Sequence, residues 1–358
     1  MNLSFIRLYN FRNYKSLELN PYSKINIIYG KNASGKSNLL EAIYLNCKSY
    51  SFKNARDIEM INFEKDSASV LGIYENDNYF DEYRVEIEKN SLKRFFLNDK
   101  KISSKYFRQG RYIVFFSPTD LNIIKNSPNE RRRFIDDSLS NINPYYDFYM
   151  TKYKKILFER NKLFKISTNK SLFEIYDREL SKIGSKIIIM RLKAIKSLNI
   201  LANIHYENLS KNDLLKTTYL STIPLSSDEE EIKRNFYKFL KLNLEEDFQR
   251  KNTGIGPHRD DIDFKINQKS AKVYASQGEQ RSVILSLKLA ECDLITKTFN
   301  NKPILLLDDV FSELDEKRSE YLLNSIKNIQ TFITTNDFKN YFNNVDINFF
   351  NIEDINRE

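Results

Sequence analysis

Residue types that define whole classes of proteins are scarce in this 358-residue chain, which has no tryptophan, two cysteines and two histidines. Cys47 and Cys292 show no C-x-x-C spacing and fall in apolar helical patterns. Packed thiols in a reducing compartment are therefore favoured over a disulfide. With His205 and His258 as the only histidines, the chain lacks the ligands of a typical zinc site. The 22 tyrosines and 26 phenylalanines must supply the large rings of the core.

Long apolar runs are also missing. The first residues lack the apolar core of a secretory signal peptide, and no charge-free stretch is long enough to cross a bilayer. We therefore expect a cytoplasmic protein without a membrane partner. The 57 basic residues exceed the 48 acidic ones, which gives a net charge of +9. This excess is compatible with a polyanionic partner such as DNA but does not by itself indicate one.

The most informative pattern present is G-x-x-x-x-G-K-S. It consists of Gly30, Lys31, Asn32, Ala33, Ser34, Gly35, Lys36 and Ser37. A β-branched strand is expected before it at residues 25–29, and an apolar helix after it. In this context backbone N–H groups and the helix dipole form a cradle for phosphates. Lys36 can reach the β- and γ-phosphates and the Ser37 hydroxyl can bind Mg²⁺, so the pattern predicts nucleoside triphosphate binding.

A second acidic motif completes the predicted site. Residues 304–307 form an apolar strand that ends in Asp308 and Asp309. In a P-loop protein the strand-end aspartate orients Mg²⁺ together with the P-loop serine, and the next acid can align the attacking water. Because nearly the whole chain separates this strand from the P-loop, the N- and C-terminal thirds must fold together. We expect one lobe from residues 1–116 and 290–358, and an inserted helical lobe from residues 117–289.

Two further segments have helix-start patterns. Ser276 and Glu279 form a capping box that encloses Gln277 and Gly278, and such a glycine-containing helix start is also a second phosphate-binding device. Because one subunit already has a cradle, the second one is expected to contact the γ-phosphate held by a neighbouring molecule. Ser312, three residues before Asp315, predicts another capped helix start. Whether this segment also contacts a neighbouring subunit is left open.

The remaining pattern is α/β. Strands are expected at residues 3–8, 68–74, 83–87, 112–116 and 331–335. In the middle, Ser127-Pro128-Asn129-Glu130 predicts a capping-box helix start, and Tyr176, Leu180, Ile183, Ile187 and Met190 mark the core face of an amphipathic helix. Arg131-Arg132-Arg133 lies in the first turns of a helix, where cations are disfavoured. These arginines are expected either to contact phosphate or to pair with acids of the other lobe.

The motifs in this order resemble those of the ABC-type ATPases of the SMC and RecF group. The shared motifs are Gly30 to Ser37, Ser276-Gln277-Gly278-Glu279-Gln280, Asp308-Asp309 and Ser312-Glu313-Leu314-Asp315. Within the group the chain is most similar to the RecF family. Ser127-Pro128 before Arg131-Arg132-Arg133, the stretch Gly256-Pro257-His258-Arg259-Asp260-Asp261 and the lack of coiled-coil arms carry that likeness. The implied fold is an ABC-type P-loop ATPase lobe with a mixed sheet and an inserted, mainly helical lobe.

The resemblance implies specific roles. Two subunits would enclose two ATP molecules with Mg²⁺, and Ser276-Gln277-Gly278 of one would contact the γ-phosphate on the other. Arg12 would lie beside the nucleotide, and Thr334 or Thr335 would sense the γ-phosphate. Lys36, Asp308 and Asp309 would serve hydrolysis, although many ABC ATPases have glutamate in place of Asp309. The shorter side chain fits slow hydrolysis and leaves the role of Asp309 open.

The resemblance also implies partners. The dimer would bind DNA at single-strand/double-strand junctions and work with RecO and RecR in loading RecA. Three alternatives remain at this stage. They are another ATPase of the RecF and SMC type, such as the partner of an anti-phage nuclease, the nucleotide-binding subunit of a membrane transporter, and a small-molecule kinase. The large insertion and the basic balance argue against a transporter subunit.

Overall fold

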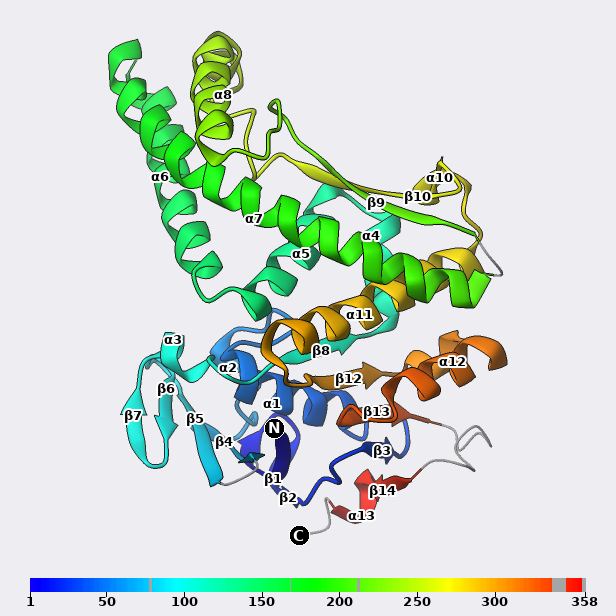
Figure 1. Cartoon of the computed structure of the whole chain (residues 1–358). Helices are drawn as coiled ribbons and strands as arrows, with labels where there is room; N and C mark the ends of the chain where they lie inside the picture. Colours follow the sequence, from blue (N-terminus) through cyan, green and yellow to red (C-terminus); the bar gives the residue numbers. More distant parts are fainter. Residues whose placement is uncertain (77–78, 168, 211–212, 337–345, 356–358) are drawn as a thin grey trace. The chain divides into compact units, whose positions relative to one another are not determined.

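The computed structural model describes residues 1–76, 79–167, 169–210, 213–336 and 346–355. The chain forms two compact units (Figure 1). Unit 1 consists of Met1–Asp120 and Glu291–Glu358, and unit 2 of Leu121–Ala290. Helix α11 (Gln277–Phe299) begins in unit 2 and ends in unit 1.

A five-stranded parallel sheet in unit 1 has the strand order β14-β3-β13-β12-β8. Its strands are β3 (Ile25–Tyr29), β8 (Ile113–Phe116), β12 (Ile304–Asp308), β13 (Thr331–Thr335) and β14 (Ile347–Asn351). The three central strands are almost entirely buried, as expected for parallel strands covered on both faces. Strands from the N-terminal and C-terminal thirds therefore pair directly, as the motif spacing predicted.

A six-stranded antiparallel sheet, in the order β2-β1-β4-β5-β6-β7, belongs to the same unit. Its strands are β1 (Asn2–Phe11), β2 (Tyr14–Leu19), β4 (Ser67–Asn76), β5 (Tyr79–Glu88), β6 (Arg94–Leu97) and β7 (Lys100–Ile102). Helix α1 (Lys36–Lys48) lies between the two sheets in Figure 1. Its Leu39, Leu40 and Ile43 share one hydrophobic core with residues of both sheets, so the helix that follows the P-loop is fixed on two sides.

The other helices of unit 1 are short except for α12. They are α2 (Asp57–Met60), α3 (Ser104–Phe107), the 3₁₀ helices η1 (Pro118–Leu121, which ends at the first residue of unit 2) and η2 (Val310–Glu313), α12 (Glu316–Ile326) and α13 (Ile352–Ile355). Both cysteines are free and buried, as their apolar surroundings in the sequence predicted.

Unit 2 is mainly helical. Besides the first part of α11 it contains α4 (Asn122–Lys125), α5 (Pro128–Ile142), α6 (Tyr146–Ile166), α7 (Lys170–Ser210), α8 (Glu229–Leu242), α9 (Leu244–Arg250) and α10 (Ala271–Tyr274). Leu180, Ile183 and Ile187 of α7 are buried, which confirms the predicted core face. The unit also has an antiparallel sheet in the order β11-β10-β9, which the sequence reading missed. Its strands are β9 (Leu215–Leu220), β10 (Asp261–Ile266) and β11 (Lys269–Ser270).

One predicted capping pattern is wrong, and another is confirmed only in part. Ser127 is the N-cap of α5, but its side chain forms no capping hydrogen bond, and Pro128 at the first helical position defines the start. Ser312 lies inside η2 and donates to the carbonyl of Asp309 at 2.7 Å. The N-cap of α12 is instead Asp315, whose carboxylate accepts from the Arg318 N–H at 2.9 Å. A carboxylate is the stronger acceptor at the positive end of a helix.

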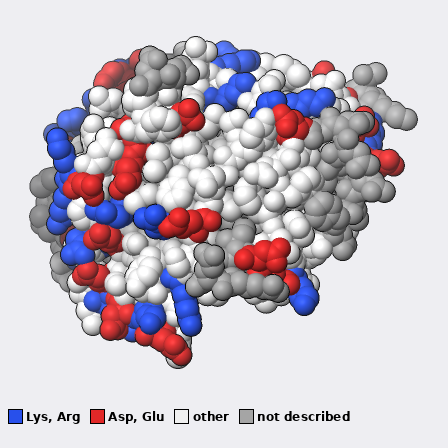
Figure 2. Space-filling view, turned by 90° about the horizontal axis from the view of Figure 1, so that it is seen from below, with Lys and Arg blue, Asp and Glu red and all other residues white. Residues whose placement is uncertain are grey.

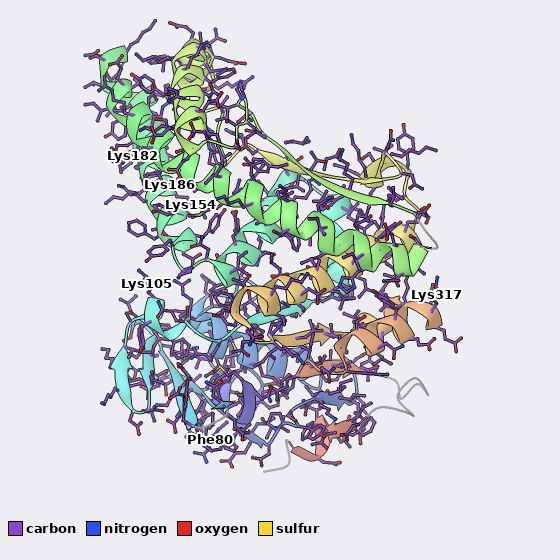
Figure 3. All side chains as sticks on the ribbon, viewed as in Figure 1. Phe80, Lys105, Lys154, Lys182, Lys186 and Lys317 are labelled. Atoms are coloured by element: carbon purple, nitrogen blue, oxygen red, sulfur yellow. The ribbon has the colours of Figure 1, made fainter. Side chains whose placement is uncertain are left out.

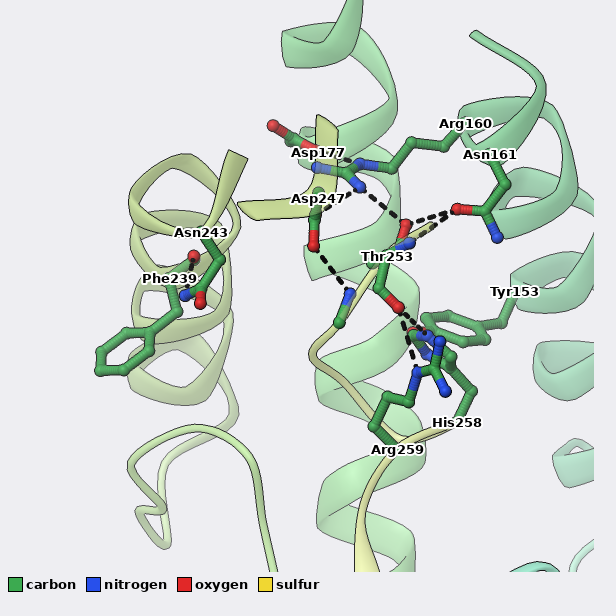
Figure 4. Close-up of polar contacts among 11 residues, drawn as sticks. Tyr153, Arg160, Asn161, Asp177, Phe239, Asn243, Asp247, Thr253, His258 and Arg259 are labelled. Atoms are coloured by element: carbon green, nitrogen blue, oxygen red, sulfur yellow. Dashed lines mark hydrogen bonds and ion pairs between the residues drawn. The ribbon is translucent and has the colours of Figure 1, made fainter. Parts of the chain in front are cut away.

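A buried ion network connects the elements of unit 2 (Figure 4). Arg160 of α6 donates to Asp177 of α7 at 2.7 Å, to Asp247 of α9 at 2.9 Å and to the Thr253 hydroxyl at 2.7 Å. All four residues are buried. Burial raises the pKa of Asp177 and Asp247, and the charge of Arg160 opposes that rise. One guanidinium is therefore shared by two buried acids.

We expect Arg160→Leu to destabilise unit 2 by roughly 3–5 kcal/mol, because it leaves two buried carboxylates without the cation that pairs with them. The matched control is Arg178→Leu, which removes an exposed pair with Glu174 at 3.9 Å and is expected to cost at most about 1 kcal/mol. Urea unfolding followed by circular dichroism measures both. Equal losses for the two variants would contradict the assigned role of Arg160.

Candidate nucleotide-binding site

The P-loop follows β3 and opens α1, as predicted. Gly35 is the N-cap of α1 with a φ of 110°, and no side chain caps the helix. The first backbone N–H groups of α1 are thus left without a side-chain acceptor, which is the arrangement that binds anions at helix starts. Lys36 lies back along the loop and donates through Nζ to the carbonyls of Gly30 at 2.7 Å and Lys31 at 2.8 Å.

The P-loop serine meets the strand-end aspartate. Ser37 Oγ donates to Asp308 Oδ1 at 2.7 Å, although 271 positions separate them in the sequence. The parallel sheet makes this contact possible, because β3 and β12 both border β13 and end at the same edge. Thr334 at the end of β13 donates to the same Asp308 oxygen at 2.7 Å. The structure therefore places the two halves of the predicted site in direct contact.

Asp309 is held in an unusual backbone conformation. Its φ is 54°, in the left-handed region that non-glycine residues rarely adopt. Its N–H donates to the Thr334 hydroxyl at 2.9 Å. Burial raises the pKa of Asp309, and the neighbouring Asp308 adds to the rise. Such strain costs about 1–3 kcal/mol and is found most often at functional sites.

The oxygen ligands at this edge fit magnesium. Ser37 supplies a hydroxyl oxygen and Asp308 a carboxylate oxygen, and both lie at the helix start that would face phosphates. Throughout the described ranges, no group of three or more His, Cys, Asp or Glu side chains could hold a metal ion. Mg²⁺ takes few protein ligands and completes its shell with water and substrate phosphates, so one hydroxyl and one carboxylate oxygen fit it.

Arg12 is fixed beside the P-loop by a residue that the sequence reading missed. Its guanidinium donates to both carboxylate oxygens of Glu41, at 2.9 and 2.7 Å. Glu41 lies on α1, its side chain is fully buried, and it also accepts from Ser51 at 2.5 Å and pairs with Lys53 at 3.3 Å. Burial raises the pKa of Glu41, but these partners outweigh it and hold the pKa below its usual value. A single acid in the otherwise apolar run of α1 was the available signal.

The turn between β1 and β2 braces the P-loop. Asn13 donates to the Ser34 carbonyl at 3.1 Å, and the Tyr14 hydroxyl donates to the Gly35 carbonyl at 2.9 Å. A Cβ on Gly35 would lie 2.5 Å from Asn13 Nδ2. Arg12 itself has a φ of 53°, so the backbone of this turn is strained in addition to being held by these hydrogen bonds. The sequence predicted Arg12 as a site residue, but neither Asn13 nor Tyr14.

The first residues of the P-loop contact helix α13, which is far away in the sequence. The Lys31 N–H donates to the Glu353 carboxylate of α13 at 3.2 Å, and a Cβ on Gly30 would lie 2.6 Å from Ile352. Asn32 and Ala33 are exposed between the two braced ends. Ala33 has a φ of 62°, a conformation that glycine adopts more readily than alanine.

The remaining predicted residues are Thr335 in unit 1 and the segment Ser276-Gln277-Gly278 in unit 2. Thr335 is the last residue of β13, opposite Tyr29 of β3, and its neighbour Thr334 is the one that contacts Asp308. Ser276 and Gln277 are exposed in unit 2, with Gly278 following in the first turn of α11. The predicted capping box is present, because the Ser276 N–H donates to Glu279 at 2.7 Å and the Glu279 N–H donates to the Ser276 hydroxyl at 3.3 Å.

Comparison with known proteins identifies the family. The profile of the RecF/RecN/SMC N-terminal domain matches residues 2–352. The DNA replication and repair protein RecF of Clostridium novyi (strain NT) is 39% identical over 337 residues, which cover 93% of this chain and 92% of the relative. The chain belongs to the RecF family. RecF of Lachnospira eligens (strain ATCC 27750 / DSM 3376 / VPI C15-48 / C15-B4) is 38% identical over 355 residues, which cover 96% and 95% of the two chains.

Solved structures agree with this membership. The recombination mediator protein RecF bound to ATP superposes with a TM-score of 0.88 at 34% identity, covering 95% of this chain and 93% of that one. An SMC head domain reaches 0.55 at 17% identity and shares the fold alone. The predicted ABC-type ATPase fold is thereby confirmed. In the part of the chain that the structure describes, no helix combines the length and apolarity needed to span a bilayer.

Gly35→Ala is expected to lower affinity for ATP about tenfold to hundredfold, because a Cβ meets Asn13 and the φ of 110° is strained for alanine. Ala33→Gly is the matched control in the same loop and should keep or slightly raise affinity, since glycine adopts a φ of 62° without strain. Isothermal titration calorimetry measures both constants. A normal affinity for Gly35→Ala would show that the loop relaxes around the added carbon.

Glu41→Gln should weaken ATP binding about tenfold, because Arg12 loses a charged bidentate partner worth roughly 1.5–3 kcal/mol. If Glu41 acts by positioning Arg12, the double variant with Arg12→Ala will bind no more weakly than Arg12→Ala alone. Glu59→Gln is the control, since that exposed carboxylate pairs with Arg56 instead. Additive losses in the double variant would contradict a role through Arg12.

Proposed function

We propose that the protein is an ATP-gated, DNA-binding homodimer of recombinational repair and replication maintenance, with slow ATP hydrolysis. The observation that carries the proposal is the contact between Ser37 and Asp308 at the edge of the parallel sheet. It joins a phosphate cradle to a carboxylate at the place where a magnesium–triphosphate complex is bound in P-loop proteins. The RecF structure with ATP, which this chain matches over 95% of its length, supports ATP as the nucleotide.

The site residues have distinct proposed tasks. Backbone N–H groups of Gly30 to Ser37 and the Lys36 ammonium hold the phosphates, while Arg12 lies beside the nucleotide. Ser37 and Asp308 hold Mg²⁺, which when bound neutralises charge on the phosphates. Asp309 orients or deprotonates the attacking water, and the burial that raises its pKa makes its carboxylate a stronger base. Thr335 or its neighbour Thr334 senses the γ-phosphate.

The proposed ATP-dependent switch requires the N-terminal segment of α11. We assign Ser276, Gln277 and Gly278 to the γ-phosphate bound by a second copy of the chain. Their exposure supports this role, because in the described structure the segment is open to a partner. ATP then bridges two subunits, so binding closes the dimer and hydrolysis loosens it. The shorter carboxylate of Asp309 reaches less far than glutamate, which suits a slow switch.

The proposed partners are DNA with single-strand/double-strand junctions, RecO and RecR, with RecA loading as the outcome. The relatives' name, DNA replication and repair protein, and the RecFOR pathway named for the matched structure support this assignment. The net charge of +9 is compatible with DNA but does not mark its location. On the face of the molecule in Figure 2, basic side chains lie among acidic ones, and the described residues form no continuous basic surface there.

Sedimentation with and without ATP, repeated with gapped and blunt duplex DNA, tests the proposal. A 42.6-kDa monomer should become a dimer when ATP is added, and the dimer should prefer gapped DNA. Ser276→Arg should abolish the dimer but leave ATP binding by one subunit largely intact. Ser171→Arg, at another exposed helix start of unit 2, should dimerise normally. A Ser276→Arg protein that dimerises as well as the wild type would disprove the shared site.

A further inference from the structure

Nine of the ten arginines of unit 2 divide into two groups by the acceptors that hold them, and the tenth, Arg281, lies in α11. Most form ion pairs with carboxylates of the same unit, namely Arg131 with Asp261, Arg133 with Asp137, Arg160 with Asp177 and Asp247, Arg178 with Glu174, Arg191 with Asp136, Arg234 with Asp228 and Arg250 with Glu246. Arg132 and Arg259 pair with no carboxylate among the described residues. The arginine run at the start of α5 therefore includes one residue, Arg132, whose charge is not neutralised by an ion pair.

This division corrects one expectation for the run 131–133. Arg131 is buried and pairs with Asp261 of its own unit at 2.7 Å, so it contacts neither phosphate nor an acid of the other lobe. Arg133 pairs with Asp137 one turn along the same helix. Of the three, only Arg132 remains a candidate for an external anion.

Arg132 and Arg259 are both held by neutral oxygens. Arg132 donates through Nη1 to the Asp260 carbonyl at 2.7 Å and through Nη2 to the Asn129 side chain. Arg259 donates through Nε to the Thr253 carbonyl at 3.1 Å (Figure 4). Arg259 is exposed, and its two terminal nitrogens have no partner in the described part of the chain. Both guanidinium groups are thus oriented without being neutralised.

Arg132, at the start of α5, contacts the loop that carries Arg259. Arg132 binds the carbonyl of the residue that follows Arg259, and the charge of Arg259 contributes to lowering the pKa of Arg132, for which burial is the larger cause. Beneath them Asp260 is buried and accepts from the Thr222 N–H at 2.8 Å, the Thr222 hydroxyl at 2.7 Å and the Tyr219 hydroxyl. The loop and the start of α5 therefore hold two positive groups in a fixed arrangement.

The loop's histidine is fixed within the same arrangement. His258 contacts the Tyr153 hydroxyl at 2.8 Å and the Thr253 carbonyl at 3.1 Å, and not the neighbouring aspartates. Burial lowers its pKa to about 4, and the charges of Arg259 and Arg132 add to the effect. His258 is therefore neutral at physiological pH and offers no negative charge to the arginines. Asp136 and Asp261 lie close enough to act on Arg132, but Arg191 and Arg131 already occupy them.

We infer that Arg132 and Arg259 form a contact site for phosphate groups of the nucleic-acid backbone. Two like charges held side by side repel each other, and an anionic ligand relieves that repulsion. The planar guanidinium binds phosphate through two parallel hydrogen bonds, and a rigid loop loses little entropy when it does so. Exposed lysines such as Lys154 and Lys182, which project from α6 and α7 in Figure 3, lack this preorganisation. The inference rests on the proposed function, because it locates the DNA that the dimer binds.

The test compares two double variants of the full-length protein with ATP. Arg132→Gln/Arg259→Gln removes the proposed contacts. Arg133→Gln/Arg250→Gln removes the same charge from exposed, ion-paired arginines of the same unit. DNA affinity is measured by fluorescence anisotropy on gapped duplex across a salt series. The log–log salt slope should become shallower by about 2 for the first variant, since each phosphate contact contributes about 0.9, and stay near the wild-type value for the second.

Each outcome decides a separate point. Equal changes in both variants, or no change in the first, would overturn the phosphate site while leaving DNA binding by the protein intact. Absence of DNA binding by the wild type would overturn the proposed function itself. If the glutamine variant fails to fold by circular dichroism, Arg132→Lys/Arg259→Lys replaces it. The lysine side chain keeps the positive charge but lacks the planar guanidinium with its two parallel donors. The variant should therefore lower affinity for DNA severalfold with a nearly unchanged salt slope, and wild-type affinity would overturn the inference.

Discussion

The hydrogen bond between Ser37 and Asp308 is the contact on which the site depends. It exists because β13 holds β3 on one side and β12 on the other, so that two strands from opposite ends of the chain finish at one edge. Thr334 of β13 joins the same carboxylate and supports the strained backbone of Asp309. Any change that shifts the register of these three strands would separate the phosphate cradle from its acid.

Around that contact, the P-loop is held by segments outside the motif. Asn13 and Tyr14 brace its end, Glu353 and Ile352 hold its start, and Glu41 fixes Arg12 beside it. The motif supplies the chemistry, while these neighbours supply the rigidity that preorganised binding requires. Unit 2 follows the same logic, because the buried Arg160 network and the Asp260 loop fix Arg132 and Arg259 in place.

The sequence predicted what local chemistry determines. A P-loop tolerates few residue types at its fixed positions, and buried parallel strands are continuous apolar runs, so β3, β12 and β13 were found within one residue of their ends. The short strands β9 and β10 were missed because alternation over six residues is a weak signal. Glu41, Asn13 and Tyr14 could not be assigned, because their roles depend on contacts across the fold. For the same reason, only the three-dimensional structure shows that Arg131 forms an ion pair and that Arg132, among the described residues, does not.

The strand order of the parallel sheet also bears on biosynthesis. Both neighbours of β3, namely β13 and β14, come from the last thirty or so residues of the sequence. A nascent chain whose P-loop has already left the ribosome therefore has no strand to pair with β3 until residues 331–351 are synthesised. Unit 2, which is continuous in sequence, can fold during that wait. The capacity to bind nucleotide thus arises only once these two strands are made, and a product that ends before residue 331 carries the motif without a working pocket.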